Sequence, residues 1–296
     1  MIGYRISRQD LEARIEADKS GWLARAATRT AGFRAAGRYV EASSIWSEVK
    51  PVYMRLQGGS KCAFCERKLE SVTHGKGEQD VEHFRPKGRV THWRLSAKLR
   101  AAGVTLTPLP ATAPGYHLLP YDLFNYTAAC KPCNSTLKAD RFPIAGPHDF
   151  GGDHPETLLA TEQPLLIYPL GDFDDDPERL IEFHGVSPMA KIASAGLQRW
   201  RALVTIEFFR LDDVTGRRSL LEDRARLLVA LFPQLQIASG AQSGDMTRAN
   251  RLVRAFQADS APHANCVRAF VRLHGRDAAK AQSLFDDAVD LIEGSS

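Results

Sequence analysis

The spacing of apolar side chains predicts helices at both ends of the chain. Near the start, Ser7 is predicted to cap a helix that places Leu11 and Ile15 on one face. Residues 44–57 carry apolar side chains at the same spacing, and the Gly-Gly pair after them predicts the end of that helix. Later in the chain, helical periodicity covers five segments: residues 197–211, 219–232, 247–257, 262–274 and 276–292.

The middle of the chain has shorter and more mixed patterns. Residues 79–84 and 165–168 are predicted to form strands, and residues 128–140 a turn that continues as a helix. Loops are predicted, from stretches rich in Ala, Pro, Gly or Asp, at residues 100–115, 145–164 and 172–176.

These patterns together predict an α+β fold that is mostly helical. We expect an N-terminal helical region over residues 1–60, a core over residues 61–164 and a mainly helical C-terminal region over residues 165–296. The chain has 296 residues, 44% of them hydrophobic and 25% charged, which is ordinary for a globular protein. This length can bury one large core or two modest ones.

Composition also bears on where the protein works and what it binds. No apolar run approaches the length that spans a bilayer, and residues 1–19 are charged and lack an apolar signal core. We therefore expect a cytoplasmic protein without membrane contact. The net charge of +4 permits nucleic-acid binding but does not by itself indicate it.

Four of the five cysteines form two Cys-x-x-Cys pairs, Cys62 with Cys65 and Cys130 with Cys133. Without an export signal, such pairs favour metal binding over disulfides, although they could also be plain buried thiols. Four thiolates complete the tetrahedron of Zn²⁺ and leave no open position for water, so the zinc would be structural. The fifth, Cys266, lies in an apolar helical pattern and is expected to be buried.

Polar residues near and between the cysteine pairs predict a second metal site. Glu82 and Asn134 offer carboxylate and amide oxygens, which hard cations such as Mg²⁺ or Mn²⁺ prefer. His83, with an ordinary pKa of about 6.5, suits proton abstraction from water near neutral pH. Neighbours on a strand point to opposite faces, so Glu82 could bind metal while His83 meets the substrate from another direction. Together they predict hydrolysis of a phosphodiester.

This set of motifs resembles that of the HNH (ββα-metal) endonucleases, in the form in which Asn replaces the last His. The resemblance covers about residues 61–142 and includes Asn125, and Lys138 four residues after Asn134. It implies a ββα-metal core with a zinc knuckle of four cysteines, flanked by the two helical regions.

The same resemblance implies a role for each site residue. Glu82 and Asn134 would bind the catalytic metal, His83 would be the base, and Asn125 would steady the loop that orients the base. The usual Asp ligand is Glu82 here, which leaves Asp80 as an alternative ligand.

A narrower resemblance is to the HNH nuclease subunits of Septu and retron-type anti-phage systems. It rests on residues 61–66, 81–87 and 142–143, and more loosely on residues 165–169 and 205–207. It implies DNA cleavage in antiviral defence, often beside an ATPase partner. The long insert rich in Pro and Ala before Tyr116 departs from that group.

Other polar residues near the motif have two readings. Arg85, Lys87, Lys131 and Lys138 are predicted to contact nucleic-acid phosphates, with plain surface charge as the alternative. His92, His117 and His148 could be extra metal ligands or ordinary structural or exposed histidines. Arg248, Arg251 and Arg254 could form a solvated helix face or a second surface that contacts DNA.

The leading hypothesis is therefore an HNH endonuclease that acts on DNA and uses Mg²⁺ or Mn²⁺. The second is a non-catalytic, zinc-stabilised module that binds nucleic acid or a protein partner. A zinc deaminase is a third reading, but that class needs His-x-Glu and an open zinc position. The Glu-His order and the second thiolate pair argue against it.

Overall fold

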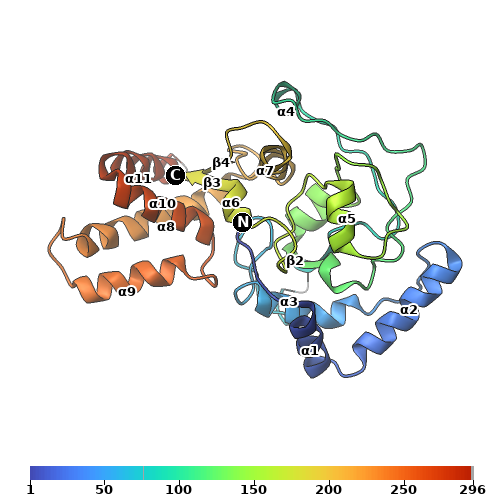
Figure 1. The fold of residues 1–296 in the computed structure, drawn as a ribbon. Coiled ribbons are helices and arrows are strands. Elements are labelled where there is room, and N and C mark those ends of the chain that lie inside the picture. The colour runs from blue at the N-terminus through green and yellow to red at the C-terminus, as the bar shows by residue number, and fades with distance from the viewer. Residues whose placement is uncertain (76, 295–296) are drawn as a thin grey trace.

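The computed structural model describes residues 1–75 and 77–294, and helices predominate in it (Figure 1). The strands of this part form two antiparallel sheets of two strands each. β1 (Gln79–His83) pairs with β2 (Tyr126–Cys130), and β3 (Ile181–His184) pairs with β4 (Ser187–Ala190). The predicted α+β class with mostly helical content is confirmed.

Two helices form the N-terminal end. In α1 (Arg8–Asp18), the Ser7 side chain accepts a hydrogen bond from the backbone amide of Asp10, and Leu11 and Ile15 are buried, as predicted. The helix that follows, α2 (Trp22–Ala36), was not predicted. Its sequence is mostly Ala, Arg and Thr with few large apolar residues, so its periodicity is weak.

The helix predicted over residues 44–57 is present in two pieces. A short 3-10 turn, η1 (Trp46–Val49), continues directly into α3 (Lys50–Leu56). The chain then turns at Gly58, whose φ of 66° is left-handed. A side chain on Gly58 would collide with the Asp259 carbonyl oxygen, 2.2 Å from a Cβ at that position. The predicted helix end is confirmed.

The central segment carries short elements. The strand predicted over residues 79–84 is β1, and the turn and helix predicted over residues 128–140 are the end of β2 and the π-helical η3 (Pro132–Lys138). Between these strands lie α4 (Ala97–Ala101) and the 3-10 turn η2 (Leu123–Asn125).

Two predictions about residues 145–168 are wrong. The loop expected over 145–164 contains α5 (Pro155–Glu162), which begins with a proline whose fixed φ suits the first helical turn. The strand expected over 165–168 is absent from the described chain, and side chains of the nearby helix α7 (Leu197–Phe208) take several of its backbone hydrogen bonds. Arg201 donates to the Pro164 and Leu166 carbonyls at 3.0 Å, and the Thr205 hydroxyl accepts from the Ile167 amide at 3.2 Å.

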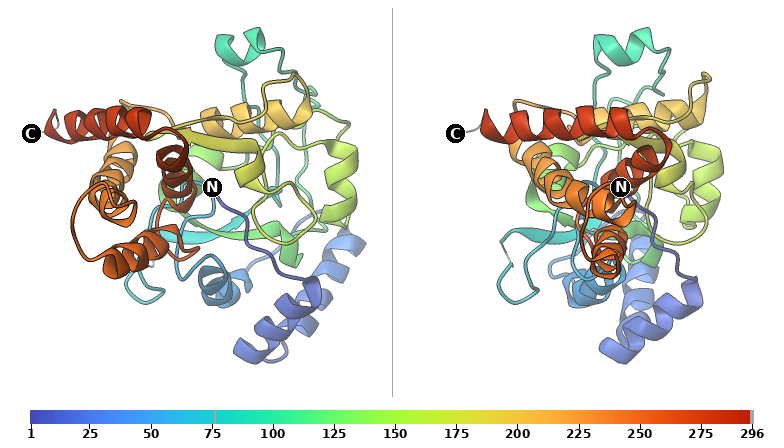
Figure 2. Two further views of the ribbon diagram at one scale, coloured as in Figure 1. Left: turned by 60° about the vertical axis from the view of Figure 1, so that its left-hand side comes forward. Right: turned by 90° about the vertical axis from the view of Figure 1, so that its left-hand side faces the viewer.

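The remaining helices follow the predicted order. A short α6 (Pro177–Leu180) follows the acidic loop at 172–176 and precedes the β3–β4 hairpin, which was not predicted. The five predicted helices are confirmed as α7 (Leu197–Phe208), α8 (Arg218–Ala238), α9 (Met246–Gln257), α10 (Ala264–Arg276) and α11 (Ala278–Glu293). Helices α8 to α11 pack together at one end of the molecule, away from α1 and α2 (Figures 1 and 2).

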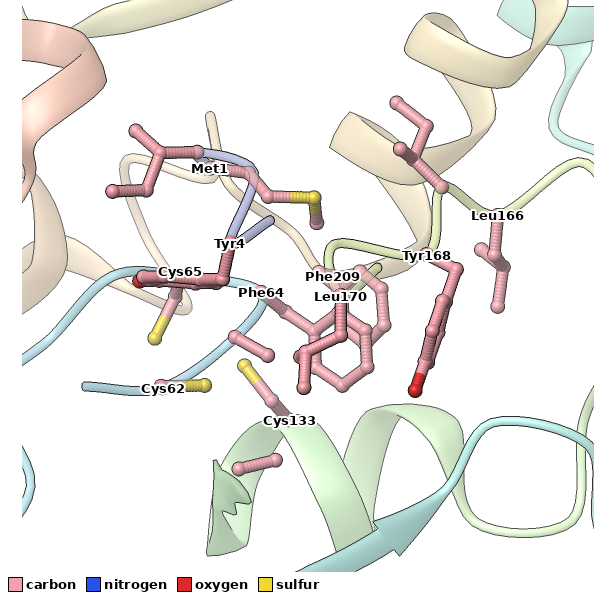
Figure 3. Close-up of a cluster of buried hydrophobic side chains, with 14 of the residues drawn as sticks. Met1, Tyr4, Cys62, Phe64, Cys65, Cys133, Leu166, Tyr168, Leu170 and Phe209 are labelled. Atoms are coloured by element: carbon pink, nitrogen blue, oxygen red, sulfur yellow. The ribbon is translucent and has the colours of Figure 1, made fainter. Parts of the chain in front are cut away.

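Nearly all of the buried apolar side chains form one continuous cluster that runs from Met1 to Ala288. It crosses the expected boundaries near residues 60 and 165, and the division into three regions stays a prediction. Figure 3 shows the part of this cluster next to the cysteines, where Phe64 stacks on Phe209 with ring centroids 4.1 Å apart. None of the helices formed by the described residues combines the length and apolar character needed to cross a bilayer.

Arg201 offers a test of how the segment before the acidic loop is held. Its guanidinium pairs with the buried carboxylate of Asp174 at 2.6 Å in addition to its two carbonyl contacts. Arg201→Ala should reduce the free energy of unfolding by about 3–5 kcal/mol, because it leaves a buried carboxylate without its partner. Urea unfolding measures this. Arg34→Ala, which removes an exposed pair with Asp153, should cost less than about 1 kcal/mol, and equal losses would contradict the assignment.

Candidate functional site

The four cysteines of the two Cys-x-x-Cys pairs come together as predicted. Their sulfur atoms all lie within 4.8 Å of one another, and all four residues are buried. A tetrahedron with Zn–S bonds of about 2.3 Å has edges of about 3.8 Å. The Sγ atoms of Cys65 and Cys130 are 3.8 Å apart, so the cluster has the dimensions of a zinc site. Figure 3 shows Cys62, Cys65 and Cys133 at the edge of the apolar cluster.

Hydrogen bonds bring the first cysteine pair to the second, from which it is separated by 64 residues of the chain. The Ala63 amide donates to the Ala128 carbonyl of β2 at 3.0 Å. The buried amide of Gln57 connects the same two segments: its Nε2 donates to the Lys61 and Ala128 carbonyls, and its Oε1 accepts from the Ala128 amide. The sequence patterns did not single out Gln57, because no motif marks it.

A buried arginine lies beside the thiolates. Arg217 donates to the Cys133 sulfur at 3.4 Å and to the Phe209 carbonyl at 2.7 Å. Hydrogen bonds from the neighbouring thiols, with Cys130 first, hold the pKa of Cys65 well below its ordinary value, and Arg217 acts in the same direction. Zn²⁺ with four thiolates carries a net charge of −2, and the Arg217 guanidinium offsets part of it. The donor set therefore fits zinc in chemistry and in size.

A cavity of about 450 Å³ is lined by residues of η1, β1 and η3 and of the segment that follows β1. The residues predicted for catalysis and metal binding that line it are Asp80, Glu82, His83 and Asn134. Asp80 and Glu82 are two apart on β1 and so share a face of the strand. Val81 and His83, at the alternate positions of the strand, line the same cavity, so strand alternation does not separate His83 from Glu82 as predicted.

His83 is held in one orientation with one nitrogen available as a base. Its Nε2 lies 3.2 Å from the Pro120 carbonyl oxygen, which can only accept a hydrogen bond, so Nε2 carries the proton. The lone pair is then on Nδ1. Trp46 and Tyr126 make edge-to-face contacts with the imidazole, with centroids 4.9 and 5.1 Å away. Burial lowers the pKa of His83 well below its ordinary value, so the ring is neutral at physiological pH.

Asn125 fixes the loop that holds His83. Its side-chain amide donates to the Leu119 and Arg85 carbonyls at 3.0 and 3.1 Å, and its Oδ1 accepts from the Arg85 amide at 2.7 Å. Leu119 immediately precedes Pro120, whose carbonyl accepts the hydrogen bond from Nε2–H of His83. Asn125 therefore connects the end of β1 with the segment that orients the imidazole, without reaching the cavity itself.

Glu82 has a buried partner that the sequence did not reveal. Lys138, the last residue of η3, places its ammonium 2.7 Å from the Glu82 carboxylate and also donates to the His83 carbonyl at 2.9 Å. Burial raises the pKa of Glu82 to about 7 despite this neighbour. Lys138 thus connects η3 to β1 and is fully buried, which contradicts its prediction as a surface phosphate contact.

The other flanking bases differ in their surroundings. Arg85 is 1% exposed, donates to the buried Glu162 carboxylate at 2.9 Å and lies over the Phe142 ring, so its prediction as a nucleic-acid contact is wrong. The chain turns inward after β1, and Arg85 becomes a core ion pair. Lys131 is half-exposed and pairs with Asp80 at the cavity. Lys87 lines the cavity and stays a candidate contact.

The remaining candidates lie away from this cavity. His92 is exposed, and His117 and His148 are half-buried. Across the described chain, the four cysteines are the group of three or more His, Cys, Asp or Glu side chains close enough to share a metal, and none of these histidines joins it. Arg248, Arg251 and Arg254 lie exposed along α9. A second cavity, of about 430 Å³, borders the acidic loop and contains none of the predicted site residues.

Comparisons with known proteins do not extend this picture. No family model matches the chain, and no curated protein or solved structure matches it either.

The zinc assignment can be tested with the same substitution at two cysteines. Cys130→Ser should lose bound zinc and melt at a lower temperature, because binding of a structural metal is part of the folding free energy. Elemental analysis of the purified protein and thermal unfolding measure both effects. Cys266→Ser is the control, since Cys266 is buried against the Gly185 carbonyl, as expected for a structural thiol, and lies outside the cluster. Equal zinc content in the two variants would contradict the site.

Proposed function

We propose that this chain is a metal-dependent HNH endonuclease that hydrolyses phosphodiester bonds in DNA and is stabilised by zinc in the four-cysteine cluster. The observation that carries the proposal is the position of His83. A neutral imidazole, held through Nε2 and with Nδ1 unprotonated, lines a cavity that also receives the oxygen donors Glu82 and Asn134.

The order of the elements supports this reading. His83 ends β1, the partner strand β2 leads directly into η3, and Asn134 lies in that helix. This strand, strand, helix order is the one that the HNH resemblance implies, with the base on the first strand and the second ligand on the helix. Asn125 and Pro120 supply the contacts that keep the base in place.

In this proposal His83 acts as the general base. Nδ1 would accept the proton of the attacking water, and the hydrogen bond from Nε2 to Pro120 keeps the ring from rotating as it becomes charged. Glu82 and Asn134 would hold Mg²⁺ or Mn²⁺, which fits a cation that keeps several waters and takes few protein ligands. When bound, such a cation would stabilise the charge that develops on the phosphate and on the leaving oxygen.

DNA as the substrate, a role in antiviral defence and an ATPase partner extend the proposal through the Septu and retron-type resemblance. The motif residues 61–66 and 81–87 that carry this resemblance include a cysteine pair and the base. These segments supply half of the four-cysteine cluster and part of the lining of the cavity.

One observation favours the second function, a zinc-stabilised binding module without catalysis. The Glu82 carboxylate is already paired with the buried ammonium of Lys138. In a non-catalytic module this ion pair would simply join β1 to η3. The two functions differ in whether a divalent cation can share or replace this partner.

The base assignment gives the first test. His83→Ala should reduce DNA cleavage in the presence of Mg²⁺ or Mn²⁺ by about 10²- to 10⁴-fold, the usual contribution of general-base catalysis. Plasmid nicking measures the rate, and zinc content and melting temperature show that the fold is retained. His92→Ala, at an exposed site outside the cavity, is the control. If wild type and His83→Ala bind DNA alike and neither cleaves it, the binding module is the better reading.

The metal assignment gives a test in pH. With a pKa of about 7, the Glu82 carboxyl holds a proton below that pH and must release it to bind a cation. At a pH near 7 His83 is already unprotonated, because burial lowers its pKa well below the ordinary value. Cleavage at limiting Mg²⁺ should therefore rise as the pH increases through about 7, and more Mg²⁺ should move the midpoint to lower pH. Asp80→Asn should keep this shift, and its loss in that variant would assign the ligand to Asp80.

A further inference from the structure

The cavity contains a lysine whose ammonium rests on an aromatic ring. The Nζ atom of Lys87 lies 4.4 Å from the ring centroid of Trp46 and 5.9 Å from that of Tyr39. Over residues 1–75 and 77–294, Lys87 has no hydrogen-bonding or ion-pairing partner. A half-buried cation that lines a cavity without an anionic partner is available for an anion that enters the cavity.

The charges around Lys87 set it apart from the other cations at the site. The three carboxylates that line the cavity already have basic partners: Asp80 pairs with Lys131, Glu82 with Lys138, and Asp140 with Arg89. Lys87 therefore adds positive charge to a cavity whose acids are paired. That excess favours an anion such as a phosphate.

Trp46 contacts both Lys87 and the base. It belongs to η1 in the N-terminal region, outside the segment that carries the HNH motifs. Its indole meets the His83 imidazole edge to face, at 4.9 Å and an interplanar angle of 88°. Tyr39 and Tyr121 pack against the same indole at 6.4 and 6.0 Å, so the ring is held from several sides.

A cation held by an aromatic face differs from one held by a carboxylate. The ring quadrupole attracts the ammonium but takes few of its three N–H donors, whereas a carboxylate would use them and cancel the charge. The Lys87 donors thus remain available to phosphate oxygens. At the same time the indole limits where the ammonium can lie relative to His83.

We propose that Trp46 is a positioning residue that holds the Lys87 ammonium as a phosphate-binding cation beside His83. This inference rests on the proposed function in one respect, that the anion is a phosphate of DNA. Lys87 contacts a non-bridging oxygen of the phosphate. Trp46 holds the Lys87 ammonium in place and fixes the orientation of the His83 ring. The N-terminal region then supplies part of the site.

A double-mutant cycle in DNA binding tests the inference. The proteins are the full chain with His83→Ala, combined with Trp46→Leu, Lys87→Met or both, and the probe is a short fluorescent DNA duplex titrated at several salt concentrations. Lys87→Met should lower the slope of log affinity against log salt by about one, the share of a single phosphate contact. Trp46→Leu should weaken binding by about 3- to 30-fold, the range of a cation–π contact.

The coupling between the two residues separates positioning from general packing. If Trp46 acts through Lys87, the double variant should bind no more weakly than Lys87→Met alone. Trp46→Phe, which keeps a ring under the ammonium, should recover most of the affinity. Trp93→Leu is the control, because Trp93 is a half-buried indole that packs on Phe208 outside the cavity. It should leave both affinity and slope unchanged.

The outcomes also separate this inference from the proposed function. An unchanged salt slope in Lys87→Met, or additive losses in the double variant, overturns the inference even if the wild-type protein cleaves DNA. A coupled loss of binding supports it even if the wild-type protein does not cleave, in which case the nuclease proposal alone fails. If the duplex is not bound at all, the inference is overturned as well.

In active protein, Lys87→Met should raise KM more than it lowers kcat.

Discussion

The closure of the four-cysteine cluster is the constraint on which the rest of the site depends. Two turns separated by 64 residues of the chain meet there, and the second of them, at Cys133, is followed directly by Asn134. The start of η3 is therefore fixed relative to β1 by the sulfur cluster, by the Gln57 amide and by the β1–β2 ladder. A structural metal that holds this junction acts on the cavity as well, because it sets how far Asn134 lies from Glu82.

Buried arginine and lysine side chains hold together many of the other segments of the fold. Arg201 satisfies the carbonyls of a segment without a strand partner, Arg217 lies against the thiolates, and Lys138 joins η3 to β1. Each brings a charge into the interior with a specific anionic or carbonyl partner, which is the condition for burying it. A basic residue next to a motif is therefore poor evidence for a nucleic-acid contact in this chain, as Arg85 demonstrates.

The sequence predicted most where chemistry or periodicity is local. The cysteine pairs, Ser7 and the five helices of the last third follow from spacing alone, and the gathering of Glu82, His83 and Asn134 follows from a motif. Gln57, Trp46 and Arg217 could not be found in this way, since each acts on residues that are distant in the chain. The strand expected over residues 165–168 fails for the same reason. The backbone of these residues looks like a strand, but side chains distant in the sequence, such as Arg201 and Thr205, take several of its hydrogen bonds.

The charge arrangement of the cavity bears on the order in which a nuclease of this design would assemble its site. With its three carboxylates paired, the cavity offers a free dication little net negative charge, and Lys87 adds a positive one. A phosphate is attracted by the positive charge of Lys87. It also brings oxygen ligands, which Mg²⁺ commonly uses together with one or two carboxylates. We therefore expect the cation to enter with the nucleic acid or after it. In the proposed site Glu82 and Asn134 would hold that cation, and the phosphate would offset part of the positive charge that Lys87 and the cation bring.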